Sequence, residues 1–208
     1  MDNQGTLVVV SGFSGAGKGT VMKALISKYG NYALSISATT RLPREGEIDG
    51  KEYFFKTREE FEDMISRDEL LEYAQYVNNY YGTPKEYVLS NIQAGKDVLL
   101  EIEIQGALEV KKKFPEAMLV FIMPPSAAEL KNRLVGRGTE DMDTIHARLK
   151  RAGEEAEDIF RYDYVVINDT VERCTEELHN LIQSQRARVE NHREFLSGVW
   201  EDVKHLAD

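Results

Sequence analysis

The chain has 208 residues, of which 42% are hydrophobic, and its formal net charge is −10. This length and composition are enough for one well-buried core with one or two small excursions. A chain this acidic, with its basic residues dispersed, is a poor candidate for binding nucleic acid or an anionic membrane through its overall field, so any polyanion must meet a local cationic pocket.

The sequence shows no sign of membrane insertion or export. No apolar stretch approaches the ~20 residues of a membrane span, and Met1–Gly5 lacks a basic segment followed by an apolar one, so a cytoplasmic location is expected. Cys174 is the single cysteine and is expected to pack in a helix. Four histidines lie in expected helices without metal-ligand spacing, so we expect surface or packing roles and no metal site: His146, His179, His192 and His205.

The first expected elements are a strand, a glycine-rich loop and a helix. Leu7–Val10 is a β-branched run, Gly12–Thr20 reads GFSGAGKGT, and apolar residues then recur at helical spacing as far as Gly30. This order suits a phosphate-binding loop, because backbone N–H groups and the helix dipole then face the phosphates. The fixed part G-x-x-x-x-G-K arises by chance in roughly one unrelated chain in twenty. The alternative is an ordinary glycine turn.

Gly19 stands where such a loop normally has Ser or Thr, whose hydroxyl meets Mg²⁺. Glycine offers no ligand, so a magnesium ion is expected to be held mainly through nucleotide phosphates and water, which it keeps readily. Thr20 still offers a hydroxyl to a phosphate, and Lys18 can reach a transferring group. The spelling G-K-G-T is typical of kinases that act on nucleoside monophosphates.

Apolar runs predict the core. Helical patterns separate them, which favours a doubly wound α/β sheet with helices on both faces. Such sheets bind ligands beyond the carboxyl ends of their strands. A single long helix is expected over Val171–Leu206. The four expected parallel strands are Leu7–Val10, Val98–Ile104, Met118–Met123 and Tyr164–Ile167.

A segment at about Ser35–Asn91 interrupts the core and is rich in tyrosine and turn residues. Its alternating stretch KEYFF predicts a small sheet with short helices. Two pairs are typical of helix starts: Thr57 with Glu60, and Thr83-Pro84 with Glu86.

Two arginines in this segment favour a phosphate site. Arg41 and Arg44 flank Pro43, with Ser37 before them and Tyr53 after. Guanidinium forks on a stiffened loop suit a phosphate dianion, because each can donate two charge-assisted hydrogen bonds. The competing interpretation is solvated surface charge.

Glu72, Tyr81 and Thr83 are polar groups amid aromatic residues in the same segment. A carboxylate can accept from a ring N–H and an exocyclic amine together, a pattern that guanine offers and adenine does not. Discrimination of this kind reaches ~10⁴ when the wrong ligand leaves the site unpaired. The alternative is that Glu72 is a helix-surface residue.

The stretch DVLLEIEIQG, Asp97–Gly106, places two carboxylates at the end of an apolar strand. Glu101 and Glu103 are two residues apart, so both are expected on one face of it. Burying two carboxylates on one face is unfavourable in free energy without a nearby cation. Lys18 and a nucleotide-bound Mg²⁺ would offset this penalty. A structural ion pair is the competing account.

A second segment runs from Pro124 to about Phe160. Ser126 with Glu129 predicts a capping box that opens a helix, GRGTEDMD breaks it, and a second helix follows. Arginines on a mobile flap can neutralise a moving phosphoryl group while closure excludes water, although a solvated helix face is the alternative for each. These arginines are Arg133, Arg137, Arg148 and Arg151.

Together these motifs resemble the guanylate kinase family, specifically its small bacterial type, over nearly the whole chain. The resemblance rests on S-x-S-x-T-T-R-x-P-R-x-G-E, N-Y-Y-G-[ST], the strand ending in Q-G, and R-x-x-G-R-G-T, in that order. It implies reversible transfer of the terminal phosphoryl group of ATP to GMP or dGMP, with Mg²⁺. It also implies a P-loop NTPase-type parallel core (1–34, 92–125 and 161–208), a GMP-binding insertion (35–91) and a helical lid (126–160).

The resemblance also implies residue roles. The ATP phosphate loop would comprise Gly12, Ser14, Gly15, Ala16, Gly17, Lys18, Gly19 and Thr20, with Asn168 beside the ATP base. The GMP phosphate would meet Arg41, Arg44, Tyr53 and Tyr81, and guanine would meet Ser37, Glu72, Thr83 and Glu103. Catalysis would use Lys18, Arg41, Arg137 and Arg148, with Glu101 near the metal and the transferring phosphate.

The chain departs from the family pattern at three places. Phe13 replaces the usual proline, which is expected to loosen the entry of the loop, and glutamates at 101 and 103 replace the aspartates of many members. Two other functions stay open. One is a scaffold module that binds phosphopeptides and has lost catalysis, although such modules typically lack an intact phosphate loop. The other is a kinase for another nucleoside monophosphate or a sugar phosphate.

Overall fold

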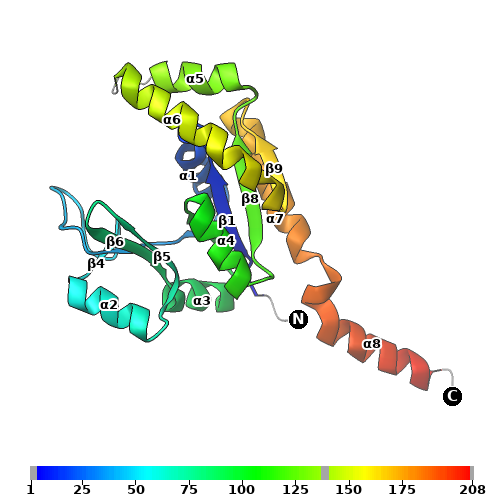
Figure 1. Ribbon diagram of the computed structural model, residues 1–208. Coiled ribbons are helices and arrows are strands. Elements are labelled where there is room, and N and C mark those ends of the chain that lie inside the picture. Colours follow the sequence, from blue (N-terminus) through cyan, green and yellow to red (C-terminus); the bar gives the residue numbers. More distant parts are fainter. Residues whose placement is uncertain (1–3, 137–140, 207–208) are drawn as a thin grey trace.

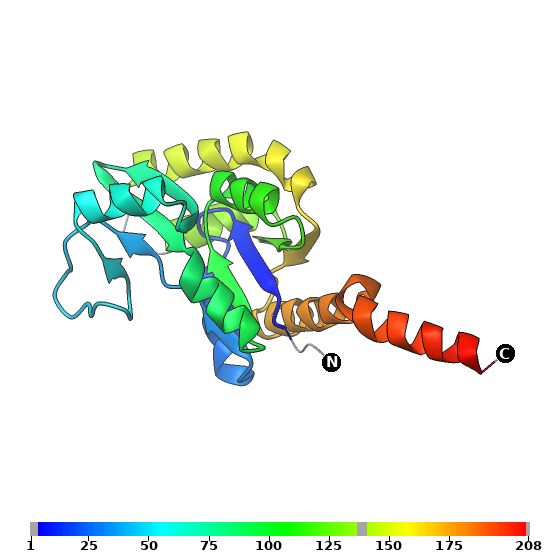
Figure 2. The same cartoon turned by 90° about the horizontal axis from the view of Figure 1, so that it is seen from below.

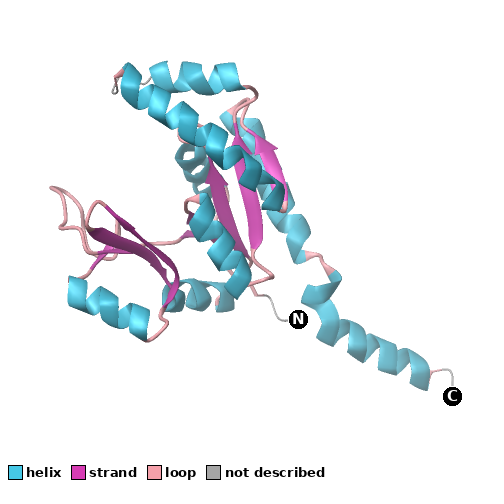
Figure 3. Ribbon diagram, viewed as in Figure 1, coloured by secondary structure: helices cyan, strands magenta, loops and turns pink. Residues whose placement is uncertain are grey.

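A five-stranded parallel sheet forms the centre of the computed structural model, which describes residues 4–136 and 141–206 (Figures 1 and 3). Its strand order is β2-β7-β1-β8-β9, and every neighbouring pair is parallel. The predicted α/β core is therefore confirmed. The strands are β1 (Leu7–Gly12), β2 (Tyr32–Leu34), β7 (Asp97–Glu101), β8 (Met118–Met123) and β9 (Tyr164–Ile167).

Helices cover both faces of this sheet because its central strands are apolar on both sides. On one face α1 (Lys18–Lys28) and α7 (Val171–Arg186) pack against Val8 and Val10. On the other face α3 (Lys85–Gln93) and α4 (Ile104–Lys113) pack against Val9. Cys174 is fully buried on α7, as expected, and burial raises the pKa of its thiol to about 12.

The first interrupting segment folds as predicted into a small sheet with short helices. Its strand order is β4-β3-β6-β5, and α2 (Arg58–Ser66) buries Phe61 against it. Thr57 and Glu60 form the expected capping box at the start of α2. The four strands are β3 (Ala38–Thr39), β4 (Phe54–Phe55), β5 (Leu70–Tyr76) and β6 (Asn79–Pro84).

The second segment forms α5 (Ala127–Gly136), α6 (Met142–Glu155) and the 3-10 helix η1 (Ala156–Arg161), above the carboxyl edge of the sheet (Figure 1). Ser126 accepts a hydrogen bond from the Glu129 backbone at 3.1 Å. The Glu129 carboxylate binds Arg133 instead of completing the predicted capping box. Leu130, Leu134 and Ile145 bury this segment against the core.

The structure corrects three expectations. The sheet has a fifth strand, β2, whose three residues are too few for a periodic signal. The strand predicted over Val98–Ile104 ends at Glu101, because Ile104 already begins α4. The single helix predicted over Val171–Leu206 is three pieces: α7, the 3-10 helix η2 (Val189–His192) and α8 (Arg193–His205).

The break after α7 has a local cause. The side-chain amide of Asn191 donates a hydrogen bond to the Gln185 carbonyl at 2.8 Å. A side chain thus satisfies a carbonyl group at the end of α7, and the chain turns there. Nearby, Arg186 reaches back to Asp97 and to the Gly95 carbonyl. Among the described helices, none combines the length and apolarity needed to cross a membrane.

Candidate active site

The glycine-rich loop links β1 to α1 as predicted. Gly15 and Gly17 have φ of 92° and 91°, backbone conformations that favour glycine. The Lys18 ammonium donates to the Gly12 carbonyl at 2.7 Å and to the Phe13 carbonyl at 3.3 Å. The loop borders a pocket of 390 Å³ lined by Ser14, Gly15, Gly17, Lys18, Gly19, Thr20, Lys23 and Glu101.

Side chains from other parts of the chain hold this loop in place. Phe13 is buried and packs edge-to-face on Phe121, with ring centroids 5.1 Å apart, so it anchors the loop entry, contrary to the expected loosening. Asn168 donates its amide to the Ala16 carbonyl at 2.8 Å, and Arg133 donates to the same carbonyl at 3.3 Å. A Cβ on Gly17 would lie 2.5 Å from the Asn168 amide nitrogen, so Gly17 must be glycine. The structure thus gives Asn168 a contact with the loop backbone, while its expected place beside the ATP base stays a prediction.

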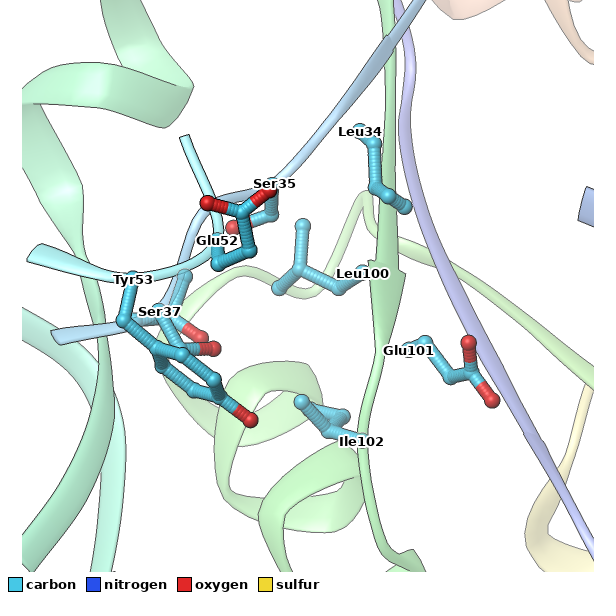
Figure 4. A pocket seen from close by; sticks show the side chains of 9 residues that line it. Leu34, Ser35, Ser37, Glu52, Tyr53, Leu100, Glu101 and Ile102 are labelled. Atoms are coloured by element: carbon cyan, nitrogen blue, oxygen red, sulfur yellow. The ribbon is translucent and has the colours of Figure 1, made fainter. Parts of the chain in front are cut away.

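A second pocket, of 170 Å³, lies between the small sheet and the carboxyl end of β7 (Figure 4). Figure 4 shows Ser37 and Tyr53 on one side of it and the β7 end on the other. Glu101 lines both pockets, and its carboxylate points away from Tyr53. The two pockets therefore share the residue Glu101. The lining residues are Leu34, Ser35, Ser37, Glu52, Tyr53, Thr83, Leu100, Glu101 and Ile102.

Arg41 belongs to a built site and is not solvated surface charge. Its guanidinium forms a two-pronged pair with Glu47, both N···O distances being 2.9 Å, and it lies 5.2 Å from the Tyr53 ring centroid. Its side chain is only 16% exposed. The Arg41 guanidinium, with the Arg44 backbone N–H, lowers the pKa of Glu47. The Arg44 residue itself is exposed, and the Tyr81 ring lies edge-on to Tyr53 at 6.2 Å.

Glu72 lies on β5 with its carboxylate largely buried, so the alternative of a helix-surface residue is wrong. It accepts a hydrogen bond from the buried Thr83 hydroxyl at 2.7 Å. Burial raises the pKa of Glu72, while the Thr83 hydrogen bond opposes this shift. On the α4 side of the Glu72 carboxylate, a Cβ added to Gly106 would lie 3.1 Å from its second oxygen, Oε2.

Glu103 does not share a strand face with Glu101, contrary to the prediction. It occupies the N-cap position of α4, and its side chain is 75% exposed, so neither carboxylate is on a buried strand face. Its Oε2 pairs with Arg151 of α6 at 2.8 Å, which is the ion pair left open as an alternative. Arg151 also donates to Glu155 at 2.7 Å.

Of the two predicted lid arginines, Arg148 donates a hydrogen bond to the Ser14 hydroxyl of the phosphate loop. Arg137 lies outside the described residues. Among the site residues that the sequence patterns did not single out are Glu47, Glu52 and Gly106. Only Glu47 had a usable signal, since it falls three residues after Arg44, within reach of a turn.

A glycine-rich loop at the carboxyl edge of a parallel sheet, with a second polar pocket across Glu101, defines a P-loop nucleotide phosphotransferase. The family model for guanylate kinase matches residues 4–185. The chain belongs to the guanylate kinase family.

Relatives match over nearly their full lengths. The guanylate kinase of Caldanaerobacter subterraneus subsp. tengcongensis is 53% identical over 199 residues, covering 96% of this chain and 97% of the relative. That of Lactococcus lactis is 48% identical over 204 residues, covering 98% and 100%. The crystal structure of guanylate kinase from Anaplasma phagocytophilum superimposes with a TM-score of 0.70 at 33% identity, covering 90% of this chain and 89% of that one.

Proposed function

We propose that the two facing pockets hold ATP and GMP, and that the protein, an ATP:GMP phosphotransferase by its family, transfers phosphoryl between them directly. The observation that carries this is the position of Glu101, which lines both pockets and so marks where the phosphates of two nucleotides would meet. ATP would lie on the core (1–34, 92–125 and 161–208) and GMP or dGMP in the insertion (35–91). The lid (126–160) would close over both.

The proposed reaction is one in-line displacement. An oxygen of the GMP phosphate attacks the terminal phosphorus of ATP, the bond from that phosphorus to its bridging oxygen breaks, and ADP leaves. Because the GMP phosphate is mostly ionised at neutral pH, no side chain need accept a proton. Lys18 and the lid arginines, Arg137 and Arg148, neutralise the charge that spreads over the moving group.

Arg41, Arg44, Tyr53 and Tyr81 orient the attacking phosphate. The bonds from Arg41 to Glu47 and to the Leu42 carbonyl use three of its five N–H groups. The Nε–H and one Nη2–H then remain for the ligand, on a guanidinium already fixed against Tyr53. Glu47 therefore acts by positioning Arg41.

Recognition of guanine would centre on Glu72. Its carboxylate accepts from the ring N–H and the exocyclic amine, while Ser37, Thr83 and Glu103 complete the base site. The Thr83 hydroxyl fixes the position of one carboxylate oxygen of Glu72 by a hydrogen bond. The other carboxylate oxygen occupies the space beside Gly106. Adenine lacks the donor pair, so it would leave a buried carboxylate unsatisfied.

The residues present fit a magnesium ion held chiefly by the nucleotide. Within residues 4–136 and 141–206, no three acidic, histidine or cysteine side chains gather as a metal site. Glu101 faces Gly19, whose added Cβ would lie 3.6 Å from its Oε2, so one carboxylate is in reach and the loop supplies no hydroxyl there. When bound, Mg²⁺ would neutralise phosphate charge while keeping several waters.

A coupled assay across GMP, dGMP, AMP, CMP and UMP tests the acceptor. We expect turnover with GMP and dGMP alone, and equal rates with AMP would refute the guanine assignment. Arg41→Met should lose most activity while ATP binding survives. Arg58→Met is the matched control, because Arg58 is an exposed arginine of the same insertion that pairs only with groups on the insertion.

ATP binding separates the enzyme from a phosphopeptide-binding scaffold. The intact loop and its pocket favour the enzyme, and a scaffold would show no ATP binding at all. Both substrates are small nucleotides of the cell interior, and we extend the proposal to a cytoplasmic location.

A further inference from the structure

Arg151 of α6, in the proposed lid, is fixed between two carboxylates. Its Nη2 donates to Glu103 Oε2 at 2.8 Å, and its Nε donates to Glu155 Oε1 at 2.7 Å. Glu155 is four residues further along the same helix, so this bond orients the guanidinium from within α6. Glu103 belongs to the core, and Figures 1 and 2 show α6 running past α4. The Arg151–Glu103 pair therefore joins the lid to the start of α4.

Glu103 lies next to the proposed guanine site. Gly106 follows it by three residues, so the two lie on one side of the first turn of α4. Gly106 faces Glu72, since an added Cβ would lie 3.1 Å from the carboxylate Oε2. An acidic residue at an N-cap position commonly caps its helix, but the Glu103 side chain makes no such bond. Its carboxylate is directed to Arg151 instead.

One oxygen of the Glu103 carboxylate is left for a ligand. Oε2 binds Arg151, and within residues 4–136 and 141–206 no second donor bonds to this carboxylate. The exocyclic amine of guanine carries two N–H donors. In the proposed base site Glu72 accepts one of them together with the ring N–H, so the second amine N–H requires another acceptor. A donor that loses water without gaining an acceptor is unfavourable, and Glu103 Oε1 can supply the acceptor.

We propose that Arg151 is a positioning residue for guanine, holding the Glu103 carboxylate so that Oε1 accepts the second amine N–H of GMP. This inference rests on the proposed function, in which Glu103 completes the base site. The Glu103 side chain is 75% exposed, so without Arg151 it would be free to turn into water. Recognition of the amine would then weaken although the carboxylate is still present.

The same helix also reaches the phosphate loop. Arg148 lies three residues before Arg151, so the two share one face of α6. Arg148 donates a hydrogen bond to the Ser14 hydroxyl of the loop. One helix face thus contacts both the loop proposed for ATP and the carboxylate proposed for the acceptor base. A substitution at Arg151 that merely displaced α6 would therefore weaken every acceptor alike, whereas a loss of positioning would weaken only an acceptor that carries the amine.

Comparison of GMP with inosine monophosphate (IMP) tests the proposal, because the base of IMP keeps the ring N–H and lacks the amine. Arg151→Gln should raise the KM for GMP about three- to tenfold. This is a fraction of what a hydrogen bond to a charged group contributes, since both side chains of the pair are more than half exposed. The inhibition constant of IMP against GMP should stay within about twofold of the wild type. Lys150→Gln is the matched control and should change neither quantity, because it removes the same charge from a neighbouring residue that pairs with Glu154 of α6.

A double-mutant cycle identifies the residue through which Arg151 acts. Glu103→Ala should raise the KM for GMP, and adding Arg151→Gln to it should cause no further change. An unchanged KM for GMP in Arg151→Gln refutes the proposal, as does an equal loss for GMP and IMP. If Glu72→Gln removes the preference for GMP over IMP while Arg151→Gln preserves it, the role of Arg151 is wrong and the guanine site stands. If Glu72→Gln preserves it too, the guanine assignment itself fails.

Discussion

Replacing Gly106 by alanine isolates the role of Glu72 without touching a polar group. Gly106 is the third residue of α4, where a new Cβ would lie 3.1 Å from Glu72 Oε2 and 3.5 Å from its Cδ. Such contacts are too tight by a few tenths of an ångström, so the carboxylate must shift. Its other oxygen accepts a hydrogen bond from Thr83, so the shift would be a rotation out of the position that the proposed contact with guanine requires.

The size of the effect follows from the bonds at risk. Hydrogen bonds to a charged group contribute about 1.5–3 kcal/mol each, so losing one raises the KM for GMP roughly 10- to 150-fold. Because the displacement is small, we expect the lower half of that range. The value of kcat and the KM for ATP should change little, since neither the phosphate loop nor Arg41 moves.

Stability should move in the opposite direction. Glycine within a helix is unfavourable by about 1 kcal/mol relative to alanine, so Gly106→Ala should unfold at the same or a higher urea concentration than the wild type. A variant that binds GMP less well without losing stability cannot be explained by general damage. Steady-state kinetics with GMP varied, together with urea denaturation, measure both quantities.

Gly153→Ala is the matched control, because Gly153 is also helical and its added Cβ would meet nothing within 4 Å. It should match the wild type in the KM for GMP. Glu72→Gln is the positive control and should lose GMP binding. If Glu72→Gln weakens GMP binding and Gly106→Ala leaves it within twofold of the wild type, Glu72 moves freely and the role of Gly106 is wrong. If Glu72→Gln has no effect either, the guanine assignment itself fails.

Three further predictions concern other parts of the chain. Glu47→Gln should raise the KM for GMP about tenfold and spare ATP binding, because Arg41 loses its charge-assisted partner; an unchanged KM would show that Glu47 does not position Arg41. Because the pKa of Glu72 is raised in the folded protein, the folded protein without GMP binds this proton more tightly than the unfolded chain, and the free energy of unfolding falls as the pH rises through the folded pKa. Glu72→Gln should therefore be more stable than the wild type at pH 8. Urea titrations should show the difference in stability between the two proteins decreasing toward pH 4. Asp97→Asn leaves Arg186 without its fully buried partner and should reduce the free energy of unfolding by about 3–5 kcal/mol, and a loss below 1 kcal/mol would contradict this account.

Local patterns predicted the core and the phosphate loop because their causes are local. Strands such as β1 are buried on both faces, so they are written as continuous apolar runs. The phosphate loop follows directly after such a strand, where its backbone N–H groups can face a ligand. The end of β7 could not be predicted in this way. Ile102 and Ile104 continue the alternation beyond Glu101, but Ile104 is buried because it begins α4. Alternation cannot distinguish the last residues of a strand from the first turn of a buried helix.

The missed site residues depend on contacts between distant segments. Gly106 matters because α4 passes the Glu72 carboxylate, and the two residues are far apart along the chain. A glycine in a helix predicts only weakness when it is considered alone. The break between α7 and α8 likewise depends on a side chain, Asn191, that turns back to a carbonyl of α7. The spacing of apolar residues gives no sign of such a side-chain hydrogen bond.

The pairing of cations with carboxylates bears on how a chain with a net charge of −10 would select the two anionic ligands proposed above. Arg41 is held by Glu47, and Arg151 by Glu103, so these arginines present directed donors and contribute little long-range positive potential. A polyanion such as nucleic acid binds mainly through such a potential. In the proposed arrangement, the single phosphate of a nucleoside monophosphate would meet the remaining N–H groups of Arg41, and its base would meet Glu72. Under the proposed function, selectivity would therefore follow from the direction of the donors, while the overall acidity would disfavour larger polyanions.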